Sequence, residues 1–177
     1  MSVDKTFIIV GAGLAGAKAA EALRHEGFDG RLVLIGEEPD RPYERPPLSK
    51  DYLRQETRDK PFVHPEAFYR DQDIELMTST RVTELDAGSK KIVLDDGQSL
   101  GYDRLLITSG AGPRHLDVPG SDLEGIRYLR TVADSERIGE RLQEGGRLVM
   151  VGAGWIGSEI TASARQKGCE VTMLEMG

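Results

Sequence analysis

The sequence predicts an α/β fold, because one strand–loop–helix–strand pattern occurs twice within its 177 residues. The copies begin at the apolar segments 6–10 and 147–151, and each segment runs directly into the motif Gly-x-Gly-x-x-Gly. Between the copies, short alternating segments and an Asp-Gly turn predict a smaller antiparallel β element. We therefore expect a parallel sheet with this antiparallel element, followed by the start of a second unit of the first kind.

The first copy has each part of a Rossmann-like dinucleotide-binding unit. The strand 6–10 leads into Gly11-Ala-Gly-Leu-Ala-Gly16, and helix-forming residues follow until Gly27. Gly11 allows a tight turn, Gly13 lets the backbone approach a pyrophosphate, and Gly16 lets the helix pack close to the strand. The helix N-terminus favours the negative charge of that pyrophosphate. Glu37 ends the next strand about 20 residues later, where a carboxylate binds the adenosine ribose.

The second copy repeats this order at the C-terminal end of the sequence. The strand 147–151 is followed by Gly152-Ala-Gly-Trp-Ile-Gly157, a helix over 158–167, a strand over 170–174 and Glu175. Two dinucleotide sites in one chain indicate hydride transfer between a nicotinamide and a flavin. The acidic residue at the ribose position favours NAD over NADP. The residues expected at the second site are Gly152, Gly154, Ile156, Gly157 and Glu175.

The segments between the two copies predict further elements. The proline-rich stretch 41–50 is held extended, and Ser49 is placed to cap a short helix through Tyr52 and Leu53. Gly112-Pro113 and Val118-Pro119-Gly120 mark the expected domain boundary. We expect helices over 66–70 and 135–142, strands over 74–77, 80–85, 91–94 and 98–100, and a buried strand over 104–108.

Composition excludes several classes of protein. The net charge of −7 argues against general binding to nucleic acid or to an anionic membrane, and no apolar run approaches a membrane span. A single cysteine, Cys169, excludes an internal disulfide and a cysteine-ligated iron–sulfur cluster. The histidines lack metal-ligand spacing, so no metal site is expected. The apolar run at 7–10 is too short for a signal peptide, and a cytoplasmic protein is expected.

Five stretches carry a resemblance to a known family: the first glycine motif, Arg41-Pro-Tyr-Glu-Arg-Pro-Pro-Leu-Ser-Lys50, Thr108-Ser-Gly110, Leu129-Arg-Thr131 with Asp134, and Gly152-Ala-Gly-Trp-Ile-Gly-Ser-Glu159. With them, the chain resembles the N-terminal part of FAD-dependent ferredoxin and rubredoxin reductases that use NADH, within the pyridine nucleotide-disulfide oxidoreductase superfamily. These enzymes serve ring-hydroxylating dioxygenases and bacterial P450s. The resemblance implies an FAD-binding domain over 1–113 and the first part of an NAD-binding domain over 114–177.

The resemblance also implies roles for individual residues. Lys50 and Glu159 would meet beside the flavin N5, where a fixed ammonium stabilises developing negative charge. From the residues alone, these two are instead ordinary solvated helix charges. Trp155 either packs against the nucleotide or covers the sheet. The FAD would be held by Gly11, Gly13, Leu14, Ala15, Gly16, Glu37, Arg45, Lys50, Val82, Thr108, Gly110 and Arg130.

The function implied by the resemblance is hydride transfer from NADH to FAD, followed by transfer of single electrons to a ferredoxin or rubredoxin. Because the lone cysteine excludes an internal cysteine pair, the electron acceptor would be external. The alternatives are a truncated dinucleotide-binding module without turnover, or a related flavoprotein of the nitrite reductase or apoptosis-inducing type; the missing cysteine disfavours a coenzyme A disulfide reductase. The family's members are about twice as long, so we expect a fragment whose incomplete second domain favours association, including a homo-oligomer.

Overall fold

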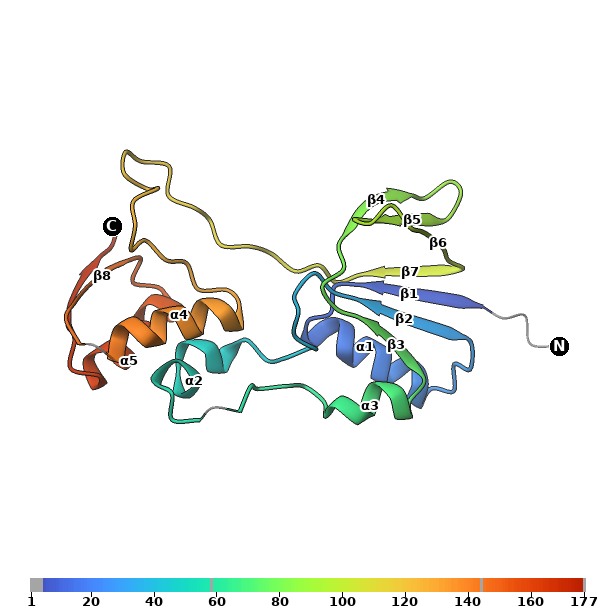
Figure 1. The fold of residues 1–177 in the computed structure, drawn as a ribbon, viewed down its shortest axis with the longest axis horizontal. Coiled ribbons are helices and arrows are strands. Elements are labelled where there is room, and N and C mark those ends of the chain that lie inside the picture. Colours follow the sequence, from blue (N-terminus) through green and yellow to red (C-terminus); the bar gives the residue numbers. More distant parts are fainter. Residues whose placement is uncertain (1–4, 58, 144, 177) are drawn as a thin grey trace. The chain divides into compact units, whose positions relative to one another are not determined.

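The computed structural model describes residues 5–57, 59–143 and 145–176 (Figure 1). The chain forms two compact units. Unit 1 contains Phe62–Ala111 and the chain before Arg45, whereas unit 2 contains Arg45–Pro61 and the chain from Gly112 onward. The assignment of 1–113 to FAD and of 114–177 to NAD stays a prediction. The contacts also show that the segment 45–61 packs with the C-terminal part of the chain, which the predicted boundary did not include.

Unit 1 is built on a four-stranded parallel sheet in the order β3-β2-β1-β7. Its strands are β1 (Thr6–Val10), β2 (Arg31–Ile35), β3 (Ile74–Met77) and β7 (Arg104–Ile107). Figure 1 shows α1 (Leu14–His25) and α3 (Glu66–Asp71) on one face of this sheet. An antiparallel meander of β4 (Val82–Asp86), β5 (Lys91–Leu94) and β6 (Ser99–Gly101) lies on the other face.

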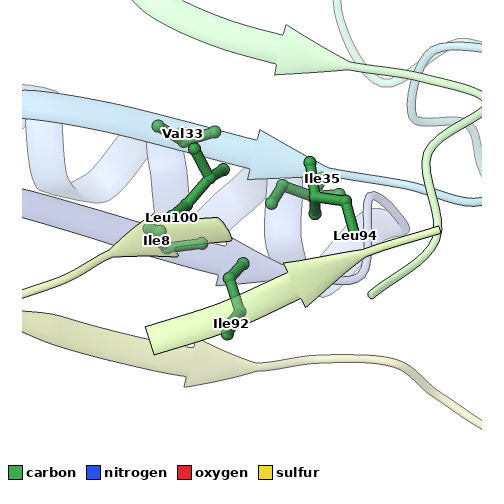
Figure 2. Close-up of a cluster of buried hydrophobic side chains, with 6 residues drawn as sticks. All are labelled: Ile8, Val33, Ile35, Ile92, Leu94 and Leu100. Carbon is green, nitrogen blue, oxygen red and sulfur yellow. The ribbon is translucent and has the colours of Figure 1, made fainter. Parts of the chain in front are cut away.

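Alternation along the strands gives the sheet two apolar faces. Ile8, Val33 and Ile35 pack against Ile92, Leu94 and Leu100 of the meander (Figure 2). The intervening residues of β1 and β2 face the helices, where Ile9, Leu32 and Leu34 form a cluster with Ala20 of α1, Tyr69 of α3 and Ile74 of β3. Each fully buried Ile or Leu contributes about 1.5–3 kcal/mol through the hydrophobic effect. The two clusters fix the sheet and therefore the loops at the carboxyl ends of its strands.

The strand predicted over 104–108 forms as β7, but the expectation that it is buried was wrong. Leu106 is 42% exposed and Ile107 is 57% exposed. Within the described residues, β7 pairs with β1 on one side and occupies the edge of the sheet. Its apolar composition is typical of a strand whose sheet is covered on both faces, and the sequence alone does not show which strand lies at an edge.

Unit 2 is built on β8 (Arg147–Val151) and β9 (Glu170–Leu174), which pair in parallel. α5 (Trp155–Gln166), α4 (Val132–Gln143), the 3₁₀ helix η1 (Pro46–Ser49) and α2 (Asp51–Arg54) complete it. Its core contains the buried residues Leu53, Leu142, Ile160, Ala164 and Cys169. Alternate residues of the two strands, Val149, Val151 and Leu174, are more than half exposed. The helices therefore cover one face of this two-stranded sheet.

Among the residues that the structure describes, no helix has both the length and the apolar content that crossing a membrane requires.

Candidate functional site

The first glycine loop joins β1 to α1 through close backbone packing. Gly11 has φ +112°, and a Cβ atom there would lie 2.3 Å from the carbonyl oxygen of Thr108. The Gly11 N–H donates to the Ile35 carbonyl at 2.8 Å, and the Thr108 hydroxyl donates to the Gly11 carbonyl at 2.8 Å. A Cβ atom at Gly16 would lie 2.1 Å from the Gly11 carbonyl oxygen. Glycine at positions 11 and 16 is therefore required by packing within the protein itself.

Gly13 differs from its neighbours because a Cβ atom there would meet no atom within 4 Å. It is the N-cap residue of α1, and as a glycine it has no side chain to cap that helix end. The first turn of α1 carries no acidic residue, while Leu14 and Ala15 are exposed. The N–H groups at this end and the helix dipole therefore face open space, which fits the negative charge of a pyrophosphate.

The second glycine loop has the same geometry. Gly152 has φ +98°, and its N–H donates to the Leu174 carbonyl at 2.8 Å. A Cβ atom at Gly157 would lie 2.0 Å from the carbonyl oxygen of Gly152. Gly154 is the N-cap of α5, and a Cβ atom added there would again meet no atom of the described residues within 4 Å. The first turn of α5 has no acidic residue. This second loop also fits a pyrophosphate.

Three exposed residues lie in or beside the second loop, at places where a nucleotide is expected. Glu175 accepts a hydrogen bond from the Ala153 N–H, which holds its carboxylate at the loop. Trp155 is 88% exposed and Ile156 is 56% exposed, so neither side chain covers the sheet core. Of the two interpretations of Trp155, the one that places it over the sheet is not supported.

Of the remaining predicted residues of unit 1, Glu37 and Gly110 follow strands of the parallel sheet, and Val82 lies in the meander. Glu37 follows β2 and forms an exposed ion pair with Arg81, with 3.4 Å between the Glu37 Oε1 and Arg81 Nη1 atoms. Val82 begins β4 and packs against the apolar cluster beneath the meander. Gly110 has φ +71° just after β7. Their contacts to a nucleotide stay predictions.

Unit 2 contains a pocket of about 260 Å³ that collects side chains from three separate stretches of sequence. Five of the predicted site residues line it: Arg45, Lys50, Arg130, Ile156 and Glu159. Arg45 donates a hydrogen bond to the carbonyl oxygen of Arg130. The remaining lining residues are Pro46, Leu48, Ser49 and Leu129. A pocket with three cationic side chains and one carboxylate is suited to a ligand that carries or develops negative charge.

Lys50 and Glu159 form an ion pair in this pocket, with 2.9 Å between Nζ and Oε2. Lys50 Nζ also donates to the Pro46 carbonyl at 3.1 Å. The side chains are 43% and 29% exposed, so both are reachable from the pocket. The hydrogen bond from Ser49 and then that from Lys50 lower the pKa of the Glu159 carboxyl below its usual 4.5. The Glu159 carboxyl is therefore ionised at neutral pH.

Ser49 was predicted as a helix cap, and that prediction was wrong. Lys50 occupies the N-cap position of α2, and no side chain caps it. The Ser49 hydroxyl instead donates to Glu159 Oε2 at 2.5 Å. Sequence reasoning missed this contact because the two residues lie 110 positions apart. The only sequence signal was the position of Ser49 directly before Lys50.

Asp134 fixes the turn that carries Arg130. Its Oδ2 atom accepts hydrogen bonds from the Arg130 and Thr131 N–H groups at 3.2 and 2.9 Å, and from the Thr131 hydroxyl at 2.8 Å. Partial burial raises the pKa of Asp134, but the hydrogen bonds from Thr131 and Arg130 outweigh it and lower the pKa below 3.8. The ionised side chain thus orients one wall of the pocket.

The structure does not bring the described histidines together. His64 is buried and stacks on Phe68, whereas His25 is exposed and His115 contacts Tyr128. Within the described residues, no group of three or more His, Cys, Asp or Glu side chains is arranged to hold a metal ion. Cys169 is buried and donates to the Leu142 carbonyl.

Comparison with known proteins places the chain in a family. The family model of pyridine nucleotide-disulphide oxidoreductases matches residues 5–177, and the chain belongs to this family. The ferredoxin–NAD(+) reductase component of the p-cumate 2,3-dioxygenase system of Pseudomonas putida is 44% identical over 168 residues, which are 95% of this chain and 42% of that protein. Rhodocoxin reductase of Rhodococcus erythropolis is 40% identical over 171 residues, which are 96% of this chain and 40% of that protein.

Solved structures agree with this family assignment. The crystal structure of a ferredoxin reductase from Rhodopseudomonas palustris matches with a TM-score of 0.90 and 41% identity, covering 96% of this chain and 42% of that one. The predicted α/β fold and the resemblance to the N-terminal part of ferredoxin and rubredoxin reductases are confirmed. The chain spans about two fifths of the length of these relatives.

Proposed function

We propose that the chain is the nucleotide-binding portion of an NADH-dependent flavoprotein that passes electrons to a ferredoxin- or rubredoxin-type protein. The observation that carries this proposal is the Lys50–Glu159 ion pair, which lies in a pocket also lined by Arg45 and Arg130. The relatives support it, because the P. putida protein is named for ferredoxin and NAD(+).

Two dinucleotides are assigned to the two glycine loops. Open space beyond Gly13 and Gly154, uncapped helix ends and the absence of first-turn carboxylates support a pyrophosphate at each loop. We assign FAD to the first loop and NADH to the second. Bound FAD supplies the redox chemistry, because it accepts hydride from NADH and releases electrons one at a time.

The residues of the pocket supply charge and position. Lys50 holds a positive charge at Nζ, and Glu159 fixes that ammonium by pairing with it at 2.9 Å. A preoriented cation stabilises negative charge that develops on a neighbouring group more effectively than water does, because it need not reorient. Arg45 and Arg130 also line this pocket and add two further cationic groups. Lys50 and Glu159 are therefore the residues to which we assign the hydride-transfer step.

The carboxylate of Glu175 accounts for a preference for NAD. Its hydrogen bond from the Ala153 N–H holds it beside the second loop, where it is suited to accept from a ribose hydroxyl. A 2′-phosphate would meet this negative charge. NADH is therefore the proposed hydride donor rather than NADPH.

The electron acceptor is proposed to be a separate protein. The sequence contains one cysteine, and Cys169 is buried within unit 2, so the chain has no cysteine pair to receive the electrons. An external one-electron carrier with an iron–sulfur centre is consistent with the names of the relatives.

An absorption spectrum of the 177-residue protein titrated with FAD tests the proposal. We expect a bound flavin band, and we expect that band to bleach when NADH is added without oxygen. Fluorescence of Trp155, which is the sole tryptophan and lies in the second loop, provides an independent signal for NADH binding. A protein that binds neither FAD nor NADH at micromolar concentrations would overturn the proposed cofactor assignment.

A further inference from the structure

Ser49 is a buried serine that contacts the Glu159 carboxylate of the Lys50–Glu159 ion pair. It is 4% exposed and ends η1, directly before Lys50. Its hydroxyl lies 2.5 Å from Glu159 Oε2 and 3.4 Å from the Pro46 carbonyl oxygen. A hydroxyl has one proton to donate, and the shorter contact to a charged oxygen is the stronger hydrogen bond. The Ser49 proton is therefore directed at Glu159.

The backbone around Ser49 is held by two further buried serines. Ser163 of α5 donates to the Ser49 carbonyl at 3.0 Å, and Ser135 of α4 donates to the Leu48 carbonyl at 2.8 Å. Both serines are 1% exposed. These two hydrogen bonds hold the backbone of the segment, whereas the direction of the Ser49 hydroxyl is set by its own hydrogen bond to Glu159.

The same carboxylate oxygen serves both neighbours. Glu159 Oε2 accepts from Ser49 at 2.5 Å and pairs with Lys50 Nζ at 2.9 Å. The hydrogen bond from Ser49 stabilises the charged carboxylate and disperses part of its negative charge, so Oε2 neutralises the Lys50 ammonium less completely. The other charged groups of the pocket, Arg45 and Arg130, are cations and add to the positive potential around Lys50.

We propose that Ser49 is a positioning residue, which anchors the Glu159 carboxylate and thereby keeps the Lys50 ammonium oriented and incompletely neutralised. The inference rests on the proposed function for its effect on electron transfer, but not for its effect on Glu159. Removal of the hydroxyl leaves Lys50 as the chief partner of Glu159. The positive field that the ammonium projects into the pocket then decreases.

The first test measures the titration of Glu159 in the protein without flavin, by carboxyl carbon NMR. We expect Ser49→Ala to raise the pKa of Glu159, because the hydrogen bond from Ser49 is the largest cause that lowers it. Ser49→Thr, which retains the hydroxyl, is expected to restore the lowered pKa. The matched control is Ser163→Ala, which removes an equally buried hydroxyl that binds a carbonyl rather than the carboxylate.

The outcomes separate a positioning role from a structural one. A pKa of Glu159 that stays unchanged in Ser49→Ala, or that moves equally in Ser163→Ala, would overturn the inference. Should Ser49→Ala not fold, Ser49→Cys replaces it, since a thiol has nearly the same shape and is a weak donor. The same shift of the Glu159 pKa is expected for it.

The second test uses the protein loaded with FAD. We expect Ser49→Ala to make the reduction potential of the flavin more negative and to slow reduction by NADH about tenfold, as for a loss of about 1.4 kcal/mol of stabilisation. The potential in Ser163→Ala is expected to equal that of the original protein. If the chain binds no FAD while Ser49→Ala still shifts Glu159, the proposed function fails and the inference about Glu159 stands.

Discussion

The Gly16 α-carbon packs so closely on the Gly11 carbonyl oxygen that an added Cβ atom would approach it to 2.1 Å. Such a contact is far inside the sum of the van der Waals radii. Because the oxygen belongs to the backbone, a side chain at position 16 would force the backbone of the loop to move. A Cβ atom at Gly13, between them, would meet no atom of the described residues within 4 Å beyond its own chain neighbours. One glycine motif thus combines positions that the fold requires with a position that it leaves open.

Replacement of Gly13 by Val separates ligand binding from folding. The new side chain points into open space and requires no unusual φ, since Gly13 has φ −92°. We expect the melting temperature to change little, while FAD binding is lost because the isopropyl group occupies the place of the pyrophosphate. Equilibrium dialysis with FAD and a thermal melt measure the two effects. Gly16→Val is the contrasting control, and it should fail to fold; stoichiometric flavin in Gly13→Val would remove the assignment.

Replacement of Gly154 by Val makes the same test in the second loop. A Cβ atom at Gly154 also meets nothing within 4 Å, so unit 2 should stay folded. We expect the quenching of Trp155 fluorescence by NADH to disappear, with FAD binding retained. Loss of FAD binding together with unchanged NADH binding would reverse the assignment of the two loops.

Replacement of Lys50 by Met tests the fixed cation. Because Met has similar length and no charge, it removes the ion pair to Glu159 with little change in volume. We expect the rate of flavin reduction by NADH to fall about 10²-fold, as for the loss of one preoriented donor in a low-dielectric site. NADH affinity should change much less. Rapid-mixing absorbance with Lys50→Arg as the charge-retaining control measures this, and an unchanged reduction rate rules out the role.

Acidification should destabilise the pocket through Asp134. Its folded pKa lies below the ordinary value of 3.8, so the unfolded state binds the proton more readily near that pH. The stabilisation is therefore fully present above about pH 4 to 5 and is lost as the pH falls through the folded pKa. We expect Asp134→Asn to flatten this acid dependence in urea unfolding measured between pH 3 and pH 6. A slope equal to that of the original protein would contradict the role of the hydrogen bonds.

Truncation of Leu53 to Ala tests how the segment 45–61 is anchored. Leu53 is fully buried in the core of unit 2, beside Ile160 and Ala164. We expect a loss of about 2–5 kcal/mol in the free energy of unfolding, from lost burial and the cavity that remains. Leu123→Ala is the matched control, since Leu123 is 67% exposed and its truncation should cost less than about 0.5 kcal/mol. Equal effects of the two would show that the segment is not anchored there.

The sequence predicted the elements whose signals are local. Both glycine loops, the strands that precede them and the hairpin at Gly97 follow from apolar runs and turn residues a few positions apart. The resemblance, and no local pattern, indicated that Lys50 and Glu159 meet, and the structure pairs their side chains. The roles of these residues with a nucleotide stay predictions.

What could not be predicted depends on contacts between distant residues. The edge position of β7 is set by which strands pair, and the hydrogen bond from Ser49 to Glu159 joins residues 110 positions apart. His64 has no sequence pattern that shows burial, yet it stacks on Phe68 and is 9% exposed. Periodicity reports on neighbours within a few residues, so such contacts leave no trace in it.

The segment 45–61 interrupts unit 1 in sequence but packs in unit 2, and this affects the order of folding. During synthesis, all of unit 1 leaves the ribosome before α4 and α5, which supply the packing partners of Leu48 and Leu53. Ser163 follows Ser49 by 114 positions, and at about 5–20 residues per second this delay is on the order of ten seconds. In that interval unit 1 can form its own core, while Leu48 and Leu53 stay exposed because the helices that bury them have not yet been synthesised. A chaperone that binds short apolar segments would find its target there.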